Sequence, residues 1–516
     1  MRRIIFIIIF LSVVWLPSST CWSYTYAYRH YSHEIEWAVT DVDILQEGIN
    51  IFDVGDDNVV IYKNTYFWPN QPPIYAIQIN FFEGHITQII TDYGAEVGEI
   101  EDKGIWDPEV FDAINDYALW YSPELFSEVR ILSDETDPSK QLTRMEELGK
   151  NLFFDKISSP DSMSCADCHA PSTGFTGPIA GINKFGAVYR GAVPTRFGNR
   201  KPPSAAYATL SPIFYYDEEE GLFIGGNFWD GRATGEGLGN PAADQALGPF
   251  LNPVEQNNDD KQAVLEQVAT SKYASLWEAV WGEPISYETE EDIEKNYDRI
   301  GLAIAAYEAS SEVNQFSSKY DLYIAGEVEL TDQEAWGLEL FNDPEKGNCA
   351  ACHPSEPDFA ISQKALFTDF SFDNLGVPKN PYNPVYDTTP TFEDPGLGGF
   401  LATRKEWQAL ATHNLGKHKV PTLRNVAKAP GKKFPKAYMH NGVFKSLKEV
   451  VHFYNTRDVE DWPAPEVADN VNEDELGNLE LTDEQEDAIV AFMETLSDGY
   501  IPHPAHPAHP THPTHH

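Results

Sequence analysis

Several stretches of this chain carry apolar residues three and four positions apart, the repeat of an amphipathic helix. The stripes are Leu142, Met145, Leu148, Leu152; Ile293, Tyr297, Ile300, Ile304, Tyr307; Trp336, Leu340; and Ile489, Met493, Leu496. Thr331 and Thr482 begin the last two stripes, with Glu334 and Gln485 three residues later, which is the pattern of a capping box. The pattern predicts a mainly α fold from about residue 131 onward.

The N-terminal part of the chain has a different pattern. Residues 58–68 and 74–82 are rich in β-branched and aromatic side chains with partial alternation, and 70–73 between them is a turn-like segment. We therefore expect residues 24–130 to form a small β-rich extension.

Two Cys-x-x-Cys-His motifs follow helical stripes, one formed by Cys165, Cys168 and His169 and the other by Cys349, Cys352 and His353. This is the attachment pattern of c-type haem, in which two thiols bond to the haem and the histidine binds its iron. A zinc site and a pair of disulfides are the alternatives, but neither needs a histidine directly after each cysteine pair. A helix, a haem motif, loops and a closing helix predict two cytochrome c-like haem domains, at 131–325 and 326–498.

The first 23 residues have the pattern of an export signal. Arg2 and Arg3 precede an apolar stretch at 4–16, which is short for a membrane span, and small residues follow at 18–20. An uncleaved anchor and a lipoprotein attached at Cys21 are the alternatives. With cleavage, the sequence predicts no membrane span and a periplasmic or otherwise extracytoplasmic protein, which agrees with covalent haem attachment.

The formal net charge of −45 argues against nucleic acid as a partner. It is compatible with a basic or weakly charged redox partner, and equally with solubility alone. Residues 499–516 form a tail in which histidine repeats with proline. A polyproline II helix would place every third residue on one edge, so the tail either binds a metal or has no specific ligand.

Further segments resemble the bacterial di-haem cytochrome c peroxidase and MauG family between about residues 142 and 496. They are Leu148-Gly-Lys-Asn-Leu-Phe-Phe-Asp155, Gly174-Phe-Thr176, Phe228-Trp-Asp-Gly-Arg-Ala233, Asn252-Pro-Val-Glu255, Gly337-x-x-Leu-Phe341, Pro421-Thr-Leu-Arg-Asn425 and Tyr438-Met-His-Asn-Gly442. The extension at 24–130 and the tail fall outside this resemblance.

The resemblance implies roles for individual residues. Trp229 would lie between the two haems and relay electrons. Gln245, Pro249 and Glu255 would lie above the peroxide-binding iron, where a carboxylate can move a proton between the two peroxide oxygens. Asn199 would hold a calcium ion between the domains, together with backbone carbonyls near 435–437, although this chain has Pro435-Lys-Ala437 where the family usually has Thr-x-Pro.

Two departures from the common family pattern concern the iron ligands. No histidine lies between His169 and His353, so the first iron is expected to have an open sixth position, as in MauG. Fourteen residues after His440, where ordinary peroxidases have a methionine ligand, this chain has Tyr454. Tyr454 is therefore expected to bind the second iron. Met439 is the alternative ligand, and Tyr454 would then be an ordinary buried aromatic residue.

The sequence and the resemblance thus predict an exported enzyme with two covalent haems and a calcium ion that reduces hydrogen peroxide to water. Its electrons would come from a small cytochrome or cupredoxin. One alternative is a MauG-like oxidase that modifies aromatic side chains of a partner protein. The other is a pure electron-transfer cytochrome, which would need neither an open iron nor Gln245 and Glu255.

Overall fold

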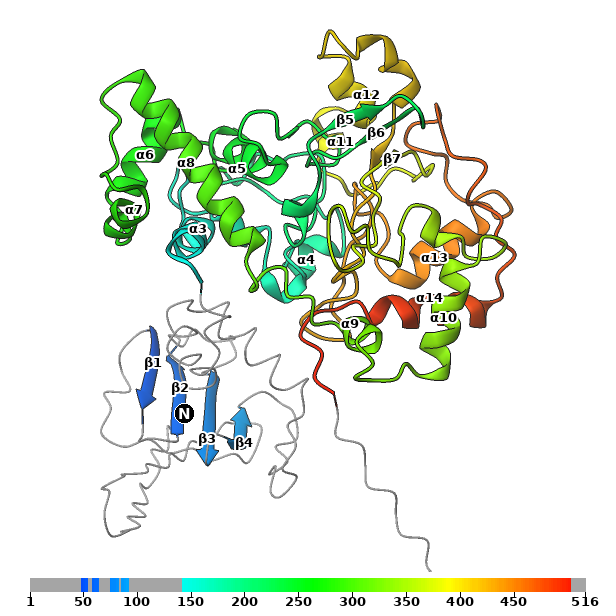
Figure 1. Ribbon diagram of the computed structural model, residues 1–516, viewed down its shortest axis with the longest axis horizontal. Helices are drawn as coiled ribbons and strands as arrows, with labels where there is room; N and C mark the ends of the chain where they lie inside the picture. Colours follow the sequence, from blue (N-terminus) through cyan, green and yellow to red (C-terminus); the bar gives the residue numbers. More distant parts are fainter. Residues whose placement is uncertain (1–47, 54–57, 65–74, 83–84, 92–141, 503–516) are drawn as a thin grey trace, which may run out of the picture. The chain divides into compact units, whose positions relative to one another are not determined.

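The computed structural model of the chain describes residues 48–53, 58–64, 75–82, 85–91 and 142–502 (Figure 1). The chain divides into two compact units, Met1–Pro138 and Ser139–His516. The predicted export signal at 1–23 and nearly all of the histidine-rich tail lie outside the described residues.

The first unit contains an antiparallel sheet with the strand order β1-β2-β3-β4. The strands are β1 (Gly48–Asp53), β2 (Asn58–Asn64), β3 (Tyr75–Phe82) and β4 (His85–Thr91). Strands β2 and β3 lie in the two segments whose alternation predicted β-structure, whereas β1 and β4 were not singled out from the sequence. The register shifts between Asn80 and Phe81, where β3 pairs with β4.

The second unit is largely helical, as the sequence predicts. Its α-helices are α3 (Arg144–Phe154), α4 (Ala180–Asn183), α5 (Pro241–Leu251), α6 (Lys261–Ala269), α7 (Ala274–Trp281), α8 (Glu290–Ala309), α9 (Lys319–Ile324), α10 (Asp332–Asn342), α11 (Val385–Thr388), α12 (Gly396–Leu401), α13 (Leu447–Thr456) and α14 (Asp483–Glu494). Short 3-10 helices are η2 (Cys165–Asp167), η3 (Pro171–Thr173), η4 (Ala208–Leu210), η5 (Cys349–Ala351), η6 (Gln408–Leu410) and η7 (Thr412–Asn414). Its strands are β5 (Tyr215–Asp217), β6 (Leu222–Ile224), β7 (Phe372–Asp373) and β8 (His418–Lys419).

Local side-chain bonds define where the helices begin. Thr331 and Thr482 form the two capping boxes that the sequence predicts, at the starts of α10 and α14. Thr143 forms a third at α3, where its hydroxyl accepts from the Glu146 amide and its own amide donates to the Glu146 carboxylate. Such reciprocal bonds satisfy amide groups that the first turn of a helix leaves without partners.

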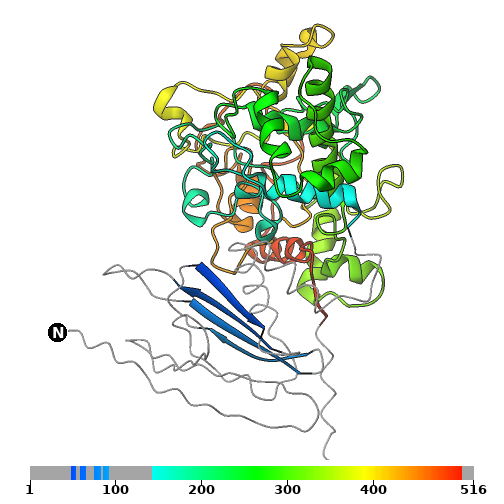
Figure 2. The same cartoon turned by 90° about the vertical axis from the view of Figure 1, so that its left-hand side faces the viewer.

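Two helix pairs of the same kind frame the two haem motifs. Helix α3 packs on α8, and α10 packs on α14. Each pair crosses closely at a glycine: a Cβ atom at Gly149 would overlap the Ala303 carbonyl oxygen, and one at Gly337 would overlap that of Ala488. In Figures 1 and 2 the two pairs lie in different parts of this unit. Because α3 and α10 lead into the motifs, each crossing positions the turn that follows it.

Aromatic rings from the two helices pack against each other at each crossing. Phe153 of α3 meets Tyr307 of α8 edge to face with ring centroids 5.5 Å apart. Phe341 of α10 meets Phe492 of α14 in the same way at 5.0 Å. Edge-to-face contacts of this kind add to the stabilisation that burial provides. Most residues of the predicted helical stripes are therefore buried in the core, but the prediction is wrong for Trp336, which is 39% exposed. The two motifs follow helix pairs that pack in the same way.

Segments outside the two helix pairs connect the parts of the second unit that contain these pairs. Strand β7 pairs with β8, which places His418 and Lys419 beside the interior. The hairpin β5–β6 and helix α12 pack around the buried rings of Phe214, Phe223 and Phe372.

The boundary predicted between residues 325 and 326 lies between α9 and α10, within one compact unit, so the division into two domains stays a prediction. No helix among the described residues has the length and apolar character of a membrane span.

The close crossing generates a test of the fold. Gly149→Ala should lower the free energy of unfolding by about 3 kcal/mol, at the upper end for overpacking, because the new methyl group meets a backbone carbonyl. Gly431→Ala is the control, since a Cβ atom there meets nothing within 4 Å. Urea unfolding followed by circular dichroism measures both changes. Equal stability of the two variants would contradict the crossing.

Candidate functional site

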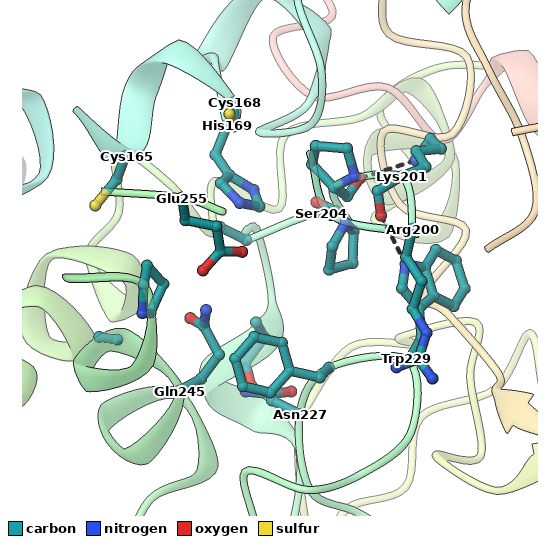
Figure 3. Close-up of a pocket in the computed structure, with 18 of the residues that line it drawn as sticks. Cys165, Cys168, His169, Arg200, Lys201, Ser204, Asn227, Trp229, Gln245 and Glu255 are labelled. Carbon is teal, nitrogen blue, oxygen red and sulfur yellow. Dashed lines mark hydrogen bonds between the residues drawn. The ribbon is translucent and has the colours of Figure 1, made fainter. Parts of the chain in front are cut away.

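The first Cys-x-x-Cys-His motif opens onto a cavity of about 260 Å³. The turn η2 carries Cys165 and leads to Cys168 and His169, and all three residues line the cavity. Figure 3 shows the two sulfur atoms on different sides of the histidine ring, and both cysteines are free. The thiols are therefore placed to reach two points on the edge of one bound group and not each other.

The histidine of this motif is prepared for metal binding. Its Nδ1 lies 3.1 Å from the Phe175 carbonyl oxygen, to which it donates as Nδ1–H. That bond leaves Nε2 with its lone pair available, as is common for histidines that bind a metal. Burial lowers the pKa of His169 to about 4, so the ring is neutral near pH 7.

The second motif repeats this arrangement around a separate cavity of about 180 Å³. Cys349, Cys352 and His353 line it, and His353 Nδ1 donates to the Phe367 carbonyl oxygen at 2.8 Å. Burial lowers the pKa of His353 to about 4 as well. Because the two cysteine pairs line different cavities, the placement does not favour one zinc ion held by four thiolates. The two free thiols and the oriented imidazole in each cavity fit a covalently attached haem.

Helix α5 and the loop after it bring the predicted peroxide-site residues to the first cavity. Gln245 and Pro249 lie on α5, and Glu255 lies in the loop that follows. Figure 3 shows the Gln245 amide and the Glu255 carboxylate pointing toward one another below the ring of His169. The structure thus gathers in one cavity the residues that the family resemblance predicted, from positions up to about ninety residues apart in the sequence.

Glu255 has the environment of a proton carrier. Its Oε2 accepts a hydrogen bond from Asn252 Nδ2 at 3.0 Å, which leaves Oε1 facing the cavity. Burial raises the pKa of Glu255 above its ordinary value, and the bond from Asn252 and the charge of Arg232 oppose this shift. The carboxylate is therefore held in place at one oxygen and can exchange a proton at the other.

Sequence reasoning missed a second carboxyl group in this cavity. Glu308 of α8 is 3% exposed and makes no hydrogen bond with any residue that the structure describes. Burial raises its pKa to about 8, so it is largely protonated near pH 7. The signal in the sequence was a charged residue four positions after Ile304, on the apolar face of the helix.

His169 is the only histidine among the described residues that line the first cavity. The cavity wall also includes Met163, which lies two residues before Cys165 on the segment that leads into the motif. This lining is compatible with the open sixth position that the sequence predicts, which stays a prediction.

Trp229 lines both cavities. Its indole Nε1 donates to the Lys201 carbonyl oxygen at 2.8 Å, and its own carbonyl oxygen accepts from the Lys419 amide at 2.8 Å. The side chain is thus fixed from two directions, and its ring forms part of the wall that separates the cavities. This is the position that the sequence prediction assigned to an electron relay.

Both candidate ligands of the second iron line the second cavity. Tyr454 lies on α13, and its hydroxyl makes no hydrogen bond with any described residue. Burial raises the pKa of Tyr454, with the nearby Cys352, Cys349 and Asp373 acting in the same direction. Met439 lies in the left-handed backbone region at φ +68°, which is uncommon for a non-glycine residue. The choice between the two ligands stays a prediction.

The expected calcium ligand Asn199 is part of the wall of the first cavity. Its backbone carbonyl oxygen accepts from Asn383 Nδ2 at 2.7 Å. No contact of its side-chain oxygen with residues 435–437 is found among the described residues, so a calcium ion at this position also stays a prediction.

Comparison with known proteins agrees with this geometry. Residues 143–329 match the family model described as di-haem cytochrome c peroxidase. The chain is 36% identical over 373 residues to the methylamine utilization protein MauG of Paracoccus denitrificans, covering 68% of this chain and 88% of that protein. It is 27% identical to the cytochrome-c peroxidase IdrP2 of Denitromonas iodatirespirans, covering 68% of this chain and 81% of that protein.

A solved structure leads to the same family. The di-haem peroxidase BthA of Burkholderia thailandensis superimposes with a TM-score of 0.59 at 31% identity, covering 71% of this chain and 89% of that protein. The chain therefore belongs to the di-haem cytochrome c peroxidase and MauG family of oxidoreductases, whose members carry two c-type haems.

Haem attachment can be tested motif by motif. The intact protein should have a mass that exceeds the polypeptide by two haems, and acid–acetone extraction should leave both attached. Cys168→Ala removes one thiol from the first cavity only, so this variant should lose or loosen the first haem and retain the second. Loss of both haems, or of neither, would contradict the assignment of one motif to each cavity.

The ligand of the second iron can be tested by electron paramagnetic resonance of the ferric protein. Tyr454→Phe removes the phenol oxygen from the second cavity, so the low-spin signal should change while the high-spin signal stays. Met439→Leu, a substitution in the same cavity, should leave both signals unchanged. The reverse result would assign the ligand to Met439.

Proposed function

We propose that this chain reduces hydrogen peroxide to water at the first cavity, with electrons that reach it through the second. In the overall reaction one O–O bond breaks, two protons and two electrons are taken up, and two water molecules leave. The observation that carries the proposal is the pairing of Glu255 and Gln245 in a cavity whose opposite wall bears His169 and two free thiols. An electron-transfer cytochrome would have no use for a proton carrier there.

The place of each residue in the first cavity indicates its role in the reaction. A haem attached at Cys165 and Cys168 would supply the iron at which the O–O bond is broken. His169 Nε2 faces this position because Nδ1 is bound to the Phe175 carbonyl oxygen. Gln245 can donate through its amide to a peroxide oxygen, and Pro249 contributes an apolar wall that excludes water.

Proton transfer is assigned to Glu255. Its Oε1 can accept a proton from one peroxide oxygen and return it to the other, which would leave as water when the O–O bond breaks. The bond from Asn252 to Oε2 keeps the carboxylate from rotating during this transfer. Trp229, fixed between the cavities by its bond to Lys201, carries the electrons from the second cavity to the first.

The electron source is proposed to be a small cytochrome or cupredoxin in an extracytoplasmic compartment. The formal net charge of −45 favours a basic donor, because opposite charges speed the encounter of redox proteins. A second candidate function is MauG-like oxidation of aromatic side chains in a partner protein. Tyr454 favours it: a phenolate on the second iron would lower its reduction potential, which makes that haem a poor acceptor of electrons from a high-potential cytochrome.

The proposal predicts that the fully ferric protein reacts with peroxide without prior reduction. Stopped-flow mixing should change the haem spectrum at once, and Glu255→Gln should slow this step by about 100-fold or more, the usual range for a lost proton carrier. Glu266→Gln, on the surface helix α6, is the matched control and should react normally. A requirement for half-reduction, or an unchanged rate in Glu255→Gln, would overturn the assignment.

The rate of the reaction with peroxide should also depend on pH, and the ionisation of Glu255 sets the direction of this dependence. Glu255 must be ionised to accept the peroxide proton, so the rate should fall as the pH falls through its pKa. Because burial raises that pKa, the fall should begin at a higher pH than an ordinary glutamate with a pKa of 4.5 would give. Glu255→Gln should remove this part of the pH profile.

A further inference from the structure

Lysine side chains join the two haem-binding halves of the second unit. We use the term seam for the contact between residues 142–325 and residues 326–502. Lys419, Lys436 and Lys445 belong to the second half, and each places its ammonium group among oxygen atoms that include some of the first half. Lys436 is buried, and Lys419 and Lys445 are partly buried. Lysine is rarely buried without compensating partners, so three such groups at one contact need a reason.

Lys436 lies deepest at the seam and is 7% exposed. Its Nζ donates to the carbonyl oxygens of Thr173 at 3.0 Å, Asn425 at 2.7 Å and Lys428 at 2.8 Å. Thr173 ends η3, directly after the first haem motif, whereas the other two carbonyls belong to the second half. Three N–H groups therefore meet three carbonyl oxygens, of which the one of Thr173 lies across the seam.

Lys445 repeats this arrangement at a second point. Its Nζ donates to the carbonyl oxygens of Asn183 at 2.8 Å and Phe185 at 2.7 Å in the first half, and to that of Gly442 in its own half. Neighbouring Asn380 reinforces the contact, since its Nδ2 donates to the same Phe185 oxygen at 3.1 Å.

Lys419 makes the third contact, next to the electron relay. Its Nζ donates to Ser211 Oγ at 2.6 Å, to Asn227 Oδ1 at 3.2 Å and to the Gly226 carbonyl oxygen, all in the first half. Its amide donates to the Trp229 carbonyl oxygen at 2.8 Å. The backbone that carries Trp229 is thus attached to the second half through this lysine.

Lys201 of the first half adds a fourth ammonium group near this contact. It is 9% exposed, and its Nζ donates to Thr176 Oγ1 and to the Pro202 carbonyl oxygen, both at 3.0 Å. Its amide donates to the His440 carbonyl oxygen across the seam at 2.8 Å. The charge of Lys201 acts on Lys436, whose pKa it lowers further after burial has lowered it.

The number of oxygen partners fits the charged form of these groups. Burial lowers the pKa of Lys445 to about 8, against the opposing charge of Glu449, and lowers that of Lys419 to about 7. The oxygen atoms around each Nζ accept hydrogen bonds, which stabilises the ammonium form. A neutral amine has only two N–H groups, so at Lys436 its lone pair would face a carbonyl oxygen. Three acceptors around Nζ therefore favour the ion with three donors.

These ammonium groups occupy oxygen atoms at the seam that could otherwise bind a divalent cation. Calcium prefers carbonyl and amide oxygens as ligands, and here such oxygens accept hydrogen bonds from lysine ammonium groups. Lys436 belongs to the segment 435–437, Lys201 lies two residues after Asn199, and both are buried, so a divalent ion held by these segments would be repelled by two like charges in a region of low dielectric. The residues present at the expected calcium position therefore do not fit that ion.

We propose that lysine ammonium groups hold the two haem-binding halves together at the seam in place of a bound divalent cation. The position of Trp229 between the two cavities then depends on covalently attached side chains, which no chelator removes. This inference concerns the packing of the halves and is independent of the proposed peroxidase activity.

The first experiment uses the haem-loaded, full-length protein. Treatment with EGTA followed by added CaCl₂ should leave the thermal unfolding midpoint and the paramagnetic resonance signals of both haems unchanged, and elemental analysis should find no stoichiometric calcium. One calcium ion per chain, or a midpoint that falls with EGTA and recovers with calcium, would overturn the proposal.

The second experiment replaces the ammonium at the seam. Lys436→Met keeps the apolar stem but leaves three buried carbonyl oxygens without a donor, so the unfolding midpoint should fall by several degrees. Lys433→Met, on the same loop and fully exposed, is the matched control and should behave as the unaltered protein. If Lys436→Met does not accumulate, Lys445→Met repeats the comparison. Equal midpoints of the seam and control variants would overturn the proposal.

Discussion

The close crossing of two helices at a glycine is the contact on which the rest of the haem-binding unit depends. At Gly149 and again at Gly337 there is no room for a side chain, so backbone meets backbone and the aromatic rings beside the crossing interlock. The helix that enters each crossing leads directly to a Cys-x-x-Cys-His motif. The direction of the histidine, and with it one wall of each cavity, therefore follows from how closely two helices approach.

The second constraint is the connection between the cavities. Trp229 has a place in both walls because its indole N–H and its carbonyl oxygen are bound to Lys201 and Lys419. These same lysines place their ammonium groups at or beside the seam, so the position of Trp229 and the packing of the halves depend on shared contacts. A change in the packing of the halves would therefore be expected to move Trp229.

The two cavities differ in ways that fit different tasks. The first has a hydrogen-bonded carboxylate and an amide opposite its histidine, which suits chemistry that moves protons. The second cavity is lined mainly by apolar side chains, and a phenol and a thioether, those of Tyr454 and Met439, are in its wall together with His353. Membership of the di-haem peroxidase and MauG family is compatible with either a small redox protein or a protein substrate as electron source. The identity of the second iron's ligand bears directly on that choice.

The sequence alone determined the features that depend on local chemistry. The spacing of Cys165, Cys168 and His169 is a property of one turn, and the capping boxes at Thr331 and Thr482 are bonds between residues three positions apart. The residues predicted for peroxide binding could be named because they lie in motifs shared with a family. Glu308 could have been noticed only by its place on the apolar face of a helix, and the lysines of the seam could not be named, because a charged residue in a loop looks the same whether it faces water or the protein interior. Only the tertiary structure decides that Lys436 meets Thr173, more than 260 residues earlier in the chain, since burial and hydrogen-bond partners arise when distant segments pack together.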